Sequence, residues 1–413
     1  MKRIALSILT AALLFSSSVY AGTIKIGFMA TLEGPYTFLG EDCLRGFEVA
    51  LNEHNSKAGG HDIEYVVAPT DASPESAIRA VTKLVEQDKV DIVIGPLSGS
   101  EGIATRDYSK TKPHVTIING TSGAQETTLV DPSDSFFRFN GDGAQWGAGL
   151  GSYVFNDKGW KTVASIAEDY SFGYTNFLGF AHGFCEAGGK ITERFWHPLG
   201  SKDFASVIAS LPDDVDALYL GLGGADAVNF LSQYAQAGGG DVGLIGGTIM
   251  VDGTVLNAKG NAKKMLIGTP SAGPQADLWE DTGWQSWVKR YQDAFPADKR
   301  FPSPSLFATL YYNATNAALN CLDEVGGDLS NNQAKFRSCL TNLELDAPNG
   351  KIKLDHNRQA IAATFVTEVV ENSDGSLSNQ VVTVVENVNQ TLGQSEAEFK
   401  KLGLPSRDIL KCD

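Results

Sequence analysis

Residues 90–102 read VDIVIGPLSGSEG, an apolar run that ends in a loop rich in glycine and serine. The run at 90–94 is short and, apart from Asp91, apolar, as expected of a strand buried on both faces of a sheet. The loop leads into a helical pattern, so this stretch predicts a strand, a turn and a helix in succession. That order is the repeating unit of parallel α/β sheets.

The same alternation continues on both sides of this stretch. Further strands are predicted at 24–28, 63–68 and 115–118, with helices at 41–55 and 74–87. A second series of predicted strands covers 162–167, 191–196, 217–220, 243–247 and 265–268. The region 279–340 is predicted to be helical, and strands are expected again at 352–354, 362–370 and 380–385.

One parallel sheet with this many strands would be unusually wide. We therefore expect an α/β fold of two Rossmann-like lobes, each a parallel sheet flanked by helices. No low-complexity linker separates the two series of strands. The lobes are therefore expected to be joined by short strands running side by side, an arrangement that suits hinge closure.

The first 21 residues have the pattern of a secretory signal peptide. Lys2 and Arg3 precede an apolar run at 4–15, and Val19 and Ala21 stand at the cleavage positions. The apolar run is too short for a permanent membrane helix, which needs about 20 residues. We expect cleavage after Ala21 and a mature chain that is exported and not embedded in a membrane.

Charge and cysteine content exclude several classes of protein. The 33 basic and 49 acidic residues give a net charge of −16, which disfavours nucleic acid as a partner. With five cysteines at least one is unpaired, and Cys321 and Cys339, near each other in helical runs, are the preferred disulfide over free thiols. The pairing of the other cysteines stays open. The sequence has no C-x-x-C, and its six histidines lack ligand spacing, so no metal site is expected.

Loops at the carboxyl ends of the predicted strands are the expected place for a ligand. Ser98, Gly99 and Ser100 follow one strand, and Thr121, Ser122 and Gly123 follow the next. Small hydroxyl residues and glycine at a helix start offer O–H and backbone N–H donors, which suit a carboxylate. The alternative is helix capping by Ser98 and turn formation by Gly123. Two such loops on adjacent strands favour the ligand site.

Aromatic residues gather in loops of the same kind. Phe38 lies in the loop after the first strand, Tyr170 and Phe172 in a loop of the second lobe, and Trp146 at the start of that lobe's first helix. Aromatics at strand ends often line an apolar pocket. Burial under a helix is the alternative, and for any one of them the two interpretations have equal weight.

Several short motifs occur in a particular order over about 350 residues. They include IKIG at 24–27, IGPLSGS at 94–100, EDY at 168–170 and GKI at 350–352. In this order and spacing the chain resembles the periplasmic solute-binding proteins of ABC transporters, of the branched-chain amino acid (Leu/Ile/Val) type. The resemblance implies the type I periplasmic binding fold, with two lobes joined by a three-stranded hinge.

The resemblance also implies where the lobes divide. The hinge crossings would fall near 139–142, 268–271 and 354–357. The first lobe would then comprise 22–140 with 271–354, and the second 141–270 with 355–413.

In amino-acid-binding relatives, the two loops of the first lobe hold the α-carboxylate. The resemblance carries this role to Ser98, Ser100, Thr121 and Ser122, while Gly99 stands where those relatives often have a ligating serine. The expected ligand-binding residues, from the residues and the resemblance together, are Ser98, Gly99, Ser100, Thr121, Ser122, Gly123, Tyr170, Phe172, Met250, Asp252, Trp146 and Phe38.

The acid that normally meets the ligand's ammonium group is missing at its expected place. Ile249 or Met250 aligns there, with Asp252 slightly beyond. Because a buried ammonium without a carboxylate partner is costly, an ordinary branched-chain amino acid is in doubt. A carboxylate on an aromatic or other apolar body is the sharper hypothesis.

The function expected from the sequence is capture of a small carboxylate by hinge closure and its delivery to an inner-membrane ABC permease. We expect a periplasmic monomer without catalytic residues, cofactor or metal. A ligand-sensing protein that feeds a receptor is one alternative, and an exported enzyme is another. For an enzyme, the glycines at 221–224 are a weak dinucleotide motif, because Asp226 replaces the third glycine.

Overall fold

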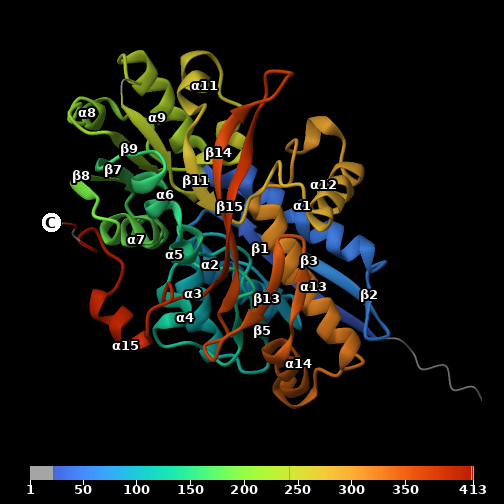
Figure 1. Cartoon of the computed structure of the whole chain (residues 1–413). Helices are drawn as coiled ribbons and strands as arrows, with labels where there is room; N and C mark the ends of the chain where they lie inside the picture. Colours follow the sequence, from blue (N-terminus) through green and yellow to red (C-terminus); the bar gives the residue numbers. More distant parts are fainter. Residues whose placement is uncertain (1–21, 241, 411, 413) are drawn as a thin grey trace, which may run out of the picture.

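Two β-sheets with covering helices organise the chain, as the computed structural model shows (Figure 1). The structure describes residues 22–240, 242–410 and 412. The leader expected at 1–21 and its cleavage after Ala21 lie outside the described residues. The α/β class and the two sheet-based lobes predicted from the sequence are confirmed.

The first sheet has six strands in the order β2-β3-β1-β4-β5-β6. Apart from the β2–β3 hairpin its pairings are parallel, and side chains such as Ile26 and Ile92 are fully buried. Its strands are β1 (Thr23–Thr31), β2 (Lys57–Ala58), β3 (His61–Thr70), β4 (Ile92–Ile94), β5 (Thr116–Ile118) and β6 (Phe136–Phe137).

Helices from both halves of the sequence cover the first sheet. Tyr311 of α13 shows this, because its hydroxyl donates to the Met29 carbonyl of β1 at 2.6 Å. The helical segments of this lobe are η1 (Gly34–Tyr36), α1 (Thr37–Glu53), α2 (Pro74–Thr82), the π-helical turn η2 (Lys83–Gln87), α3 (Gly99–Lys110), α4 (Glu126–Leu129), α12 (Thr282–Ala294), η4 (Ala297–Lys299), α13 (Leu306–Glu324) and α14 (Ser330–Asn342).

The second sheet has nine strands in the order β12-β13-β14-β11-β10-β9-β7-β8, with β15 paired to β14. Pairings from β8 to β11 are parallel, whereas those of β12 to β15 are antiparallel. The strands are β7 (Thr162–Glu168), β8 (Lys190–His197), β9 (Ala217–Gly221), β10 (Gly243–Gly246), β11 (Pro270–Gly273), β12 (Leu345–Ala347), β13 (Gly350–Leu354), β14 (Ala360–Glu371) and β15 (Leu377–Val388).

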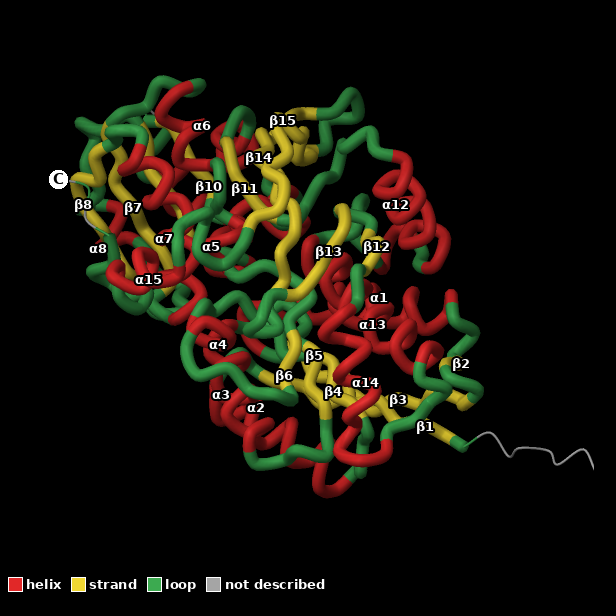
Figure 2. The backbone as a smooth tube through the Cα atoms, turned by 60° about the horizontal axis from the view of Figure 1, so that its bottom comes forward, coloured by secondary structure: helices red, strands yellow, loops and turns green. Residues whose placement is uncertain are grey.

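Shorter helices surround the second sheet. They are α5 (Gly143–Trp146), α6 (Leu150–Asn156), α7 (Ser171–Glu186), α8 (Ala205–Ile208), α9 (Gly224–Gln236), η3 (Thr248–Val251), α10 (Gly253–Leu256), α11 (Gly260–Leu266), α15 (Glu396–Phe399) and η5 (Lys400–Leu402). Figure 2 shows the two sheets in separate parts of the molecule, with β13 and β14 running between them. No helix of the described residues is long and apolar enough to cross a membrane.

One predicted strand is wrong. Residues 265–268 were expected to be a strand, but α11 runs to Leu266, and the strand is β11, at Pro270–Gly273. The short apolar sequence at 265–267 is the end of a helix whose Leu266 is fully buried, and short apolar runs do not distinguish the two cases. Because β11 pairs with β10 and β14, residues 271–273 lie in the second sheet, and the chain leaves that sheet after Gly273.

A buried polar network holds the segments that run between the sheets. Arg138, which is fully buried, donates through Nε to Gln359 and through Nη1 to the Ala124 carbonyl at 2.7 Å. Gln359 Nε2 donates to the Asn140 carbonyl at 2.8 Å. Burial lowers the pKa of Arg138 to about 10, and Asp142, 3.9 Å away, opposes that shift. These contacts hold the segment at 138–142 and the segment around Gln359 together.

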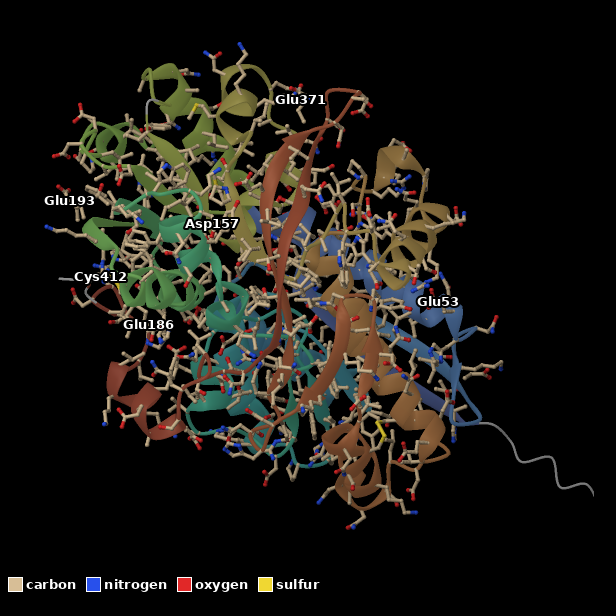
Figure 3. All side chains as sticks on the ribbon, viewed as in Figure 1. Glu53, Asp157, Glu186, Glu193, Glu371 and Cys412 are labelled. Carbon is tan, nitrogen blue, oxygen red and sulfur yellow. A yellow bond between two sulfur atoms is a disulfide. The ribbon has the colours of Figure 1, made fainter. Side chains whose placement is uncertain are left out.

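Two disulfides are present in the described residues. Cys321 and Cys339, the pair preferred from the sequence, join α13 to α14. Cys185 of α7 pairs with Cys412 near the C-terminus, and Cys43 is a buried free thiol. Figure 3 labels Cys412 close to Glu186, the residue after Cys185. The second disulfide fastens the C-terminal tail to the second lobe.

Candidate functional site

A small cavity of about 20 Å³ lies where loops of the two lobes meet. This volume is far below the range of about 300–1,000 Å³ usual for drug-sized ligands, so the two lobes are closed tightly around it. The lining residues are Tyr36, Leu97, Ser98, Gly99, Thr121, Gly123, Trp146, Tyr170, Phe172, Ile249 and Phe307. They include residues from both predicted serine-rich and threonine-rich loops and three of the predicted aromatics.

Aromatic rings form much of the wall of this cavity. Phe172 packs edge-on against Trp146, with ring centroids 5.6 Å apart, and lies 6.1 Å from the ring of Tyr170. Phe172 and Trp146 are 5% and 3% exposed, so the rings are shielded from solvent although they line a void. No Lys, Arg or His is among the described residues that line it. This wall suits an apolar, flat ligand body.

One end of the cavity is the N-terminus of α3. Ser98 is the N-cap of that helix: its Oγ accepts from the Glu101 backbone N–H at 3.3 Å and donates to the Ala72 carbonyl at 2.9 Å. The first N–H groups of a helix have no acceptor within the helix, and the helix dipole favours an anion there. The hydroxyl of Ser98 therefore organises the helix end, and the backbone of the first turn is the stronger candidate for holding a carboxylate.

Gly99 lies where the two lobes are in contact. A Cβ at this position would be 2.9 Å from Ser171 Oγ and 3.0 Å from the backbone N of Phe172. Gly123 is similar, because its Cβ would be 2.8 Å from Phe172 Cδ2. The structure is therefore closed around the cavity, and a serine in place of Gly99 would have no room for its side chain.

Glu168, which was not among the expected binding residues, lies behind the aromatic wall. The Tyr36 hydroxyl donates to Glu168 Oε2 and is 3.0 Å from the Tyr170 hydroxyl. The Gly223 backbone N–H donates to Glu168 Oε1 at 3.0 Å. Burial raises the pKa of Glu168 to about 8. This group links η1 of the first lobe to β7 of the second and fixes both tyrosine rings.

The sequence offered only a partial signal for Glu168. It adjoins Asp169, and of two adjacent acids at a strand end one points to one face of the sheet and the other to the opposite face. Glu168 is fully buried, and Asp169 forms an ion pair with the exposed Arg407. Its link to Tyr36 depends on the fold, because the two residues are 132 positions apart.

Other expected binding residues lie outside the cavity lining. Phe38 is 63% exposed on α1, because Tyr36, two residues earlier, is the aromatic that turns inward. Ser100 Oγ contacts Ser171 Oγ at 3.3 Å across the two lobes. Ser122 Oγ faces α3, since a Cβ on Gly102 would be 1.8 Å from it.

The expected binding residues of the 248–252 loop lie in different places. Ile249 lines the cavity, whereas Met250 is fully buried in the core of the second lobe. Asp252 caps α10, accepting from the Thr254 N–H at 2.6 Å, and lines a different pocket. Burial raises the pKa of Asp252 to about 6.

Comparison with known proteins agrees with this geometry. Residues 23–376 match the family described as periplasmic binding protein. A relative from Brucella melitensis named Leu/Ile/Val-binding protein homolog 6 is 23% identical over 394 residues, covering 94% of this chain and 97% of the relative.

Two solved structures are similar in fold. One, a solute-binding protein of an ABC transporter from Rhodopseudomonas palustris BisB5 solved with 3,4-dihydroxybenzoic acid, has a TM-score of 0.80 at 22% identity, covering 89% of this chain and 98% of that one. Another solute-binding protein from R. palustris, solved with benzoate, has a TM-score of 0.79 at 22% identity, covering 88% and 98%.

Proposed function

The chain belongs to the periplasmic binding protein family, and we propose that it captures a small aromatic or other apolar acid between its lobes for an ABC uptake system. The relative from Brucella melitensis is named as a Leu/Ile/Val-binding protein homolog, and the solved neighbour from R. palustris BisB5 as a solute-binding protein of an ABC transporter. We also propose that the chain delivers this acid to an inner-membrane permease. It would act in the periplasm as a non-catalytic monomer after loss of the leader.

The observation that carries the ligand class is the chemistry of the cavity wall. Trp146, Phe172 and Phe307 supply flat apolar surface, and the α3 N-terminus supplies the place for a carboxylate. Ile249, one of the two residues that the resemblance aligns with the acid of amino-acid-binding relatives, lines the cavity. An ammonium group placed against this residue would lose its hydration without gaining a partner. The two R. palustris neighbours suggest benzoates as the first acids to test.

Closure is the proposed mechanism of capture. The acid would first meet the α3 end of the first lobe, and Tyr170 and Phe172 of the second lobe would then cover its ring. A ligand favours the closed form only through the contacts it gains there. The hydrogen-bonded group of Tyr36, Glu168 and Tyr170 adds a contact between lobes that does not depend on the ligand.

Thermal unfolding with candidate ligands tests the proposal. Benzoate, 4-hydroxybenzoate and leucine would each be added to the wild type, to Phe172→Ala and to the control Phe155→Ala, whose ring packs on Phe184. A ligand at 100 times its Kd adds about 2.7 kcal/mol to the stability of the folded state. We expect a benzoate to raise the melting temperature of the wild type and control, with a smaller rise in Phe172→Ala. A larger rise with leucine than with either benzoate would refute the ligand class.

A further inference from the structure

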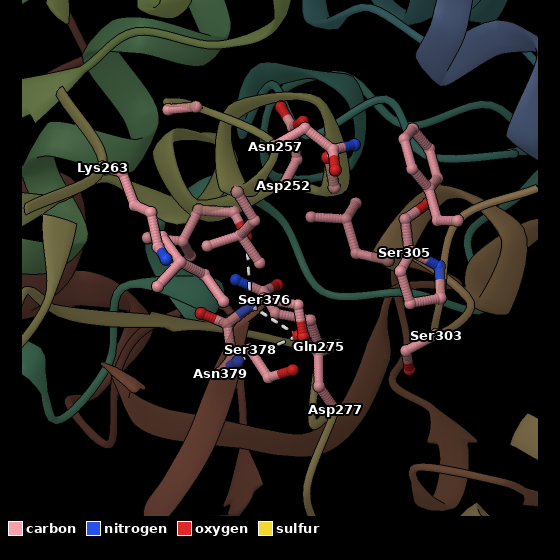
Figure 4. A pocket seen from close by; sticks show the side chains of 18 of the residues that line it. Asp252, Asn257, Lys263, Gln275, Asp277, Ser303, Ser305, Ser376, Ser378 and Asn379 are labelled. Atoms are coloured by element: carbon pink, nitrogen blue, oxygen red, sulfur yellow. Dashed lines mark hydrogen bonds between the residues drawn. The ribbon is translucent and has the colours of Figure 1, made fainter. Parts of the chain in front are cut away.

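A second and larger pocket, of about 80 Å³, lies beside the first and shares no lining residue with it. Its walls come from the region of α10, from the start of β15, and from residues 301–306, which lead into α13 (Figure 4). Since α13 packs on the first sheet and β15 belongs to the second, both lobes contribute to it.

Two carboxyl groups, the buried Asp252 and the half-buried Asp277, line this pocket. Asp277 Oδ2 accepts from the Asn379 backbone N–H at 2.9 Å and from its side-chain Nδ2 at 3.0 Å. Asp252 accepts from backbone N–H groups at the start of α10 and from the Gly224 N–H at 3.3 Å. Burial is the largest influence on both and raises the pKa of each, opposed by hydrogen bonds. In the part of the chain that the structure describes, neither carboxyl group has a cationic side chain in an ion pair.

Unpartnered acceptors add to these carboxyl groups. Gln275 Oε1 and Asn379 Oδ1 have no hydrogen-bond partner among the described residues, although both residues line the pocket and are 3% and 1% exposed. Buried polar atoms are usually satisfied, so the Asn379 oxygen favours a donor beside it, whereas Gln275 Oε1 packs against Gly273 of β11. Two lysines line the edge of the pocket: Lys263 is engaged by Glu371 and the Gly375 carbonyl, and Lys259 is exposed to solvent.

The rest of the pocket wall is apolar and favours a hydrogen-bond donor that is carried on an apolar body. Leu256, Phe301 and Leu306 face the same space. The described residues contain no group of three or more His, Cys, Asp or Glu that could hold a metal ion. A guest with several N–H donors, a positive charge and an apolar body would match both halves of the wall.

We propose that this second pocket binds a small organic ammonium compound. Its ammonium group lies among the carboxyl and amide oxygens of Asp252, Asp277 and Asn379, and its apolar body lies against Phe301. The site is independent of the acid-binding cavity, because the two have opposite charge preference and separate walls.

Titration with benzylammonium chloride tests this pocket, with binding followed by calorimetry and by two-dimensional NMR. Uncharged benzyl alcohol has the same ring and serves as the ligand control. Asp277→Asn keeps the acceptor oxygen but removes the charge, and Asp214→Asn changes an exposed acid outside the pocket. We expect saturable binding of one benzylammonium per chain, unchanged in Asp214→Asn and weakened by roughly tenfold or more in Asp277→Asn, equivalent to at least 1.4 kcal/mol.

A second variant keeps the test informative if Asp277→Asn fails to fold. Phe301→Ala removes the apolar wall from a half-buried position and should also weaken benzylammonium binding. The proposal is overturned if the wild type shows no saturable binding, if benzyl alcohol binds as tightly as benzylammonium, or if neither pocket variant weakens binding.

Discussion

Replacing Gly99 by alanine tests whether the lobes must touch for the ligand to be held. The new Cβ would be 3.0 Å from the backbone N of Phe172, and a backbone atom cannot rotate away as the Ser171 hydroxyl could. In the open form that contact is absent. Gly99 begins α3, and alanine is favoured over glycine in a helix by up to about 1 kcal/mol. The substitution should therefore act against closure without destabilising the free protein.

The size of the effect follows from the contact. Forcing an extra methyl group into a packed interface costs about 1–3 kcal/mol. Because only the closed form carries this cost, the affinity for benzoate should fall about 5- to 150-fold. Calorimetric titration with benzoate measures the change, and urea unfolding without ligand checks the fold.

Gly283→Ala is the matched control, because Gly283 is in the first turn of α12 and its Cβ would meet only Asp281 Oδ1, at 3.0 Å. This variant should bind benzoate as the wild type does. Unchanged affinity in Gly99→Ala, or an equal loss in Gly283→Ala, would refute the reasoning.

Three further predictions concern the folded state. Because the pKa of Glu168 rises from 4.5 to about 8 on burial, its protonated form is favoured by folding, and the free energy of unfolding should fall as pH rises between these values. Urea unfolding across this range should show a smaller fall in Glu168→Gln. Arg138→Ala should lower the free energy of unfolding by about 3–5 kcal/mol, since it leaves a buried carboxylate and several buried acceptors unpaired. The control Lys289→Ala, which breaks an exposed ion pair, should cost under about 1 kcal/mol, and equal losses would contradict the assignment. Replacing Cys321 and Cys339 by serine should lower the urea midpoint by an amount equivalent to about 3 kcal/mol, and no change would show that the disulfide does not constrain the unfolded chain.

The parallel core was predictable from the sequence because its strands are buried on both faces. The run at 92–94 is apolar throughout, the run at 24–28 is interrupted only by Lys25, and both are strands in the structure. The strand predicted at 265–268 was wrong because a short apolar run is also typical of a buried helix end. The strands at 362–370 and 380–385 were predicted, but their antiparallel pairing with register shifts, as β14 and β15 of the second sheet, was not.

The candidate site was predictable as far as local sequence determines it. The loop at 95–100 follows a strand and starts a helix, so its position at the cavity follows from the topology of α/β sheets. Tyr36 and Phe38 could not be separated in this way, because which one turns inward depends on contacts with the other lobe. The Cys185–Cys412 disulfide spans 227 residues and likewise requires the tertiary fold.

Small-angle X-ray scattering of the chain with and without benzoate tests the central claim most directly. Closure of two lobes around a guest makes the molecule more compact, so the radius of gyration should fall as benzoate is added and level off at saturation. The same fall should be smaller in Gly99→Ala at equal benzoate concentration. A radius of gyration that stays constant while calorimetry reports bound benzoate would contradict capture by closure.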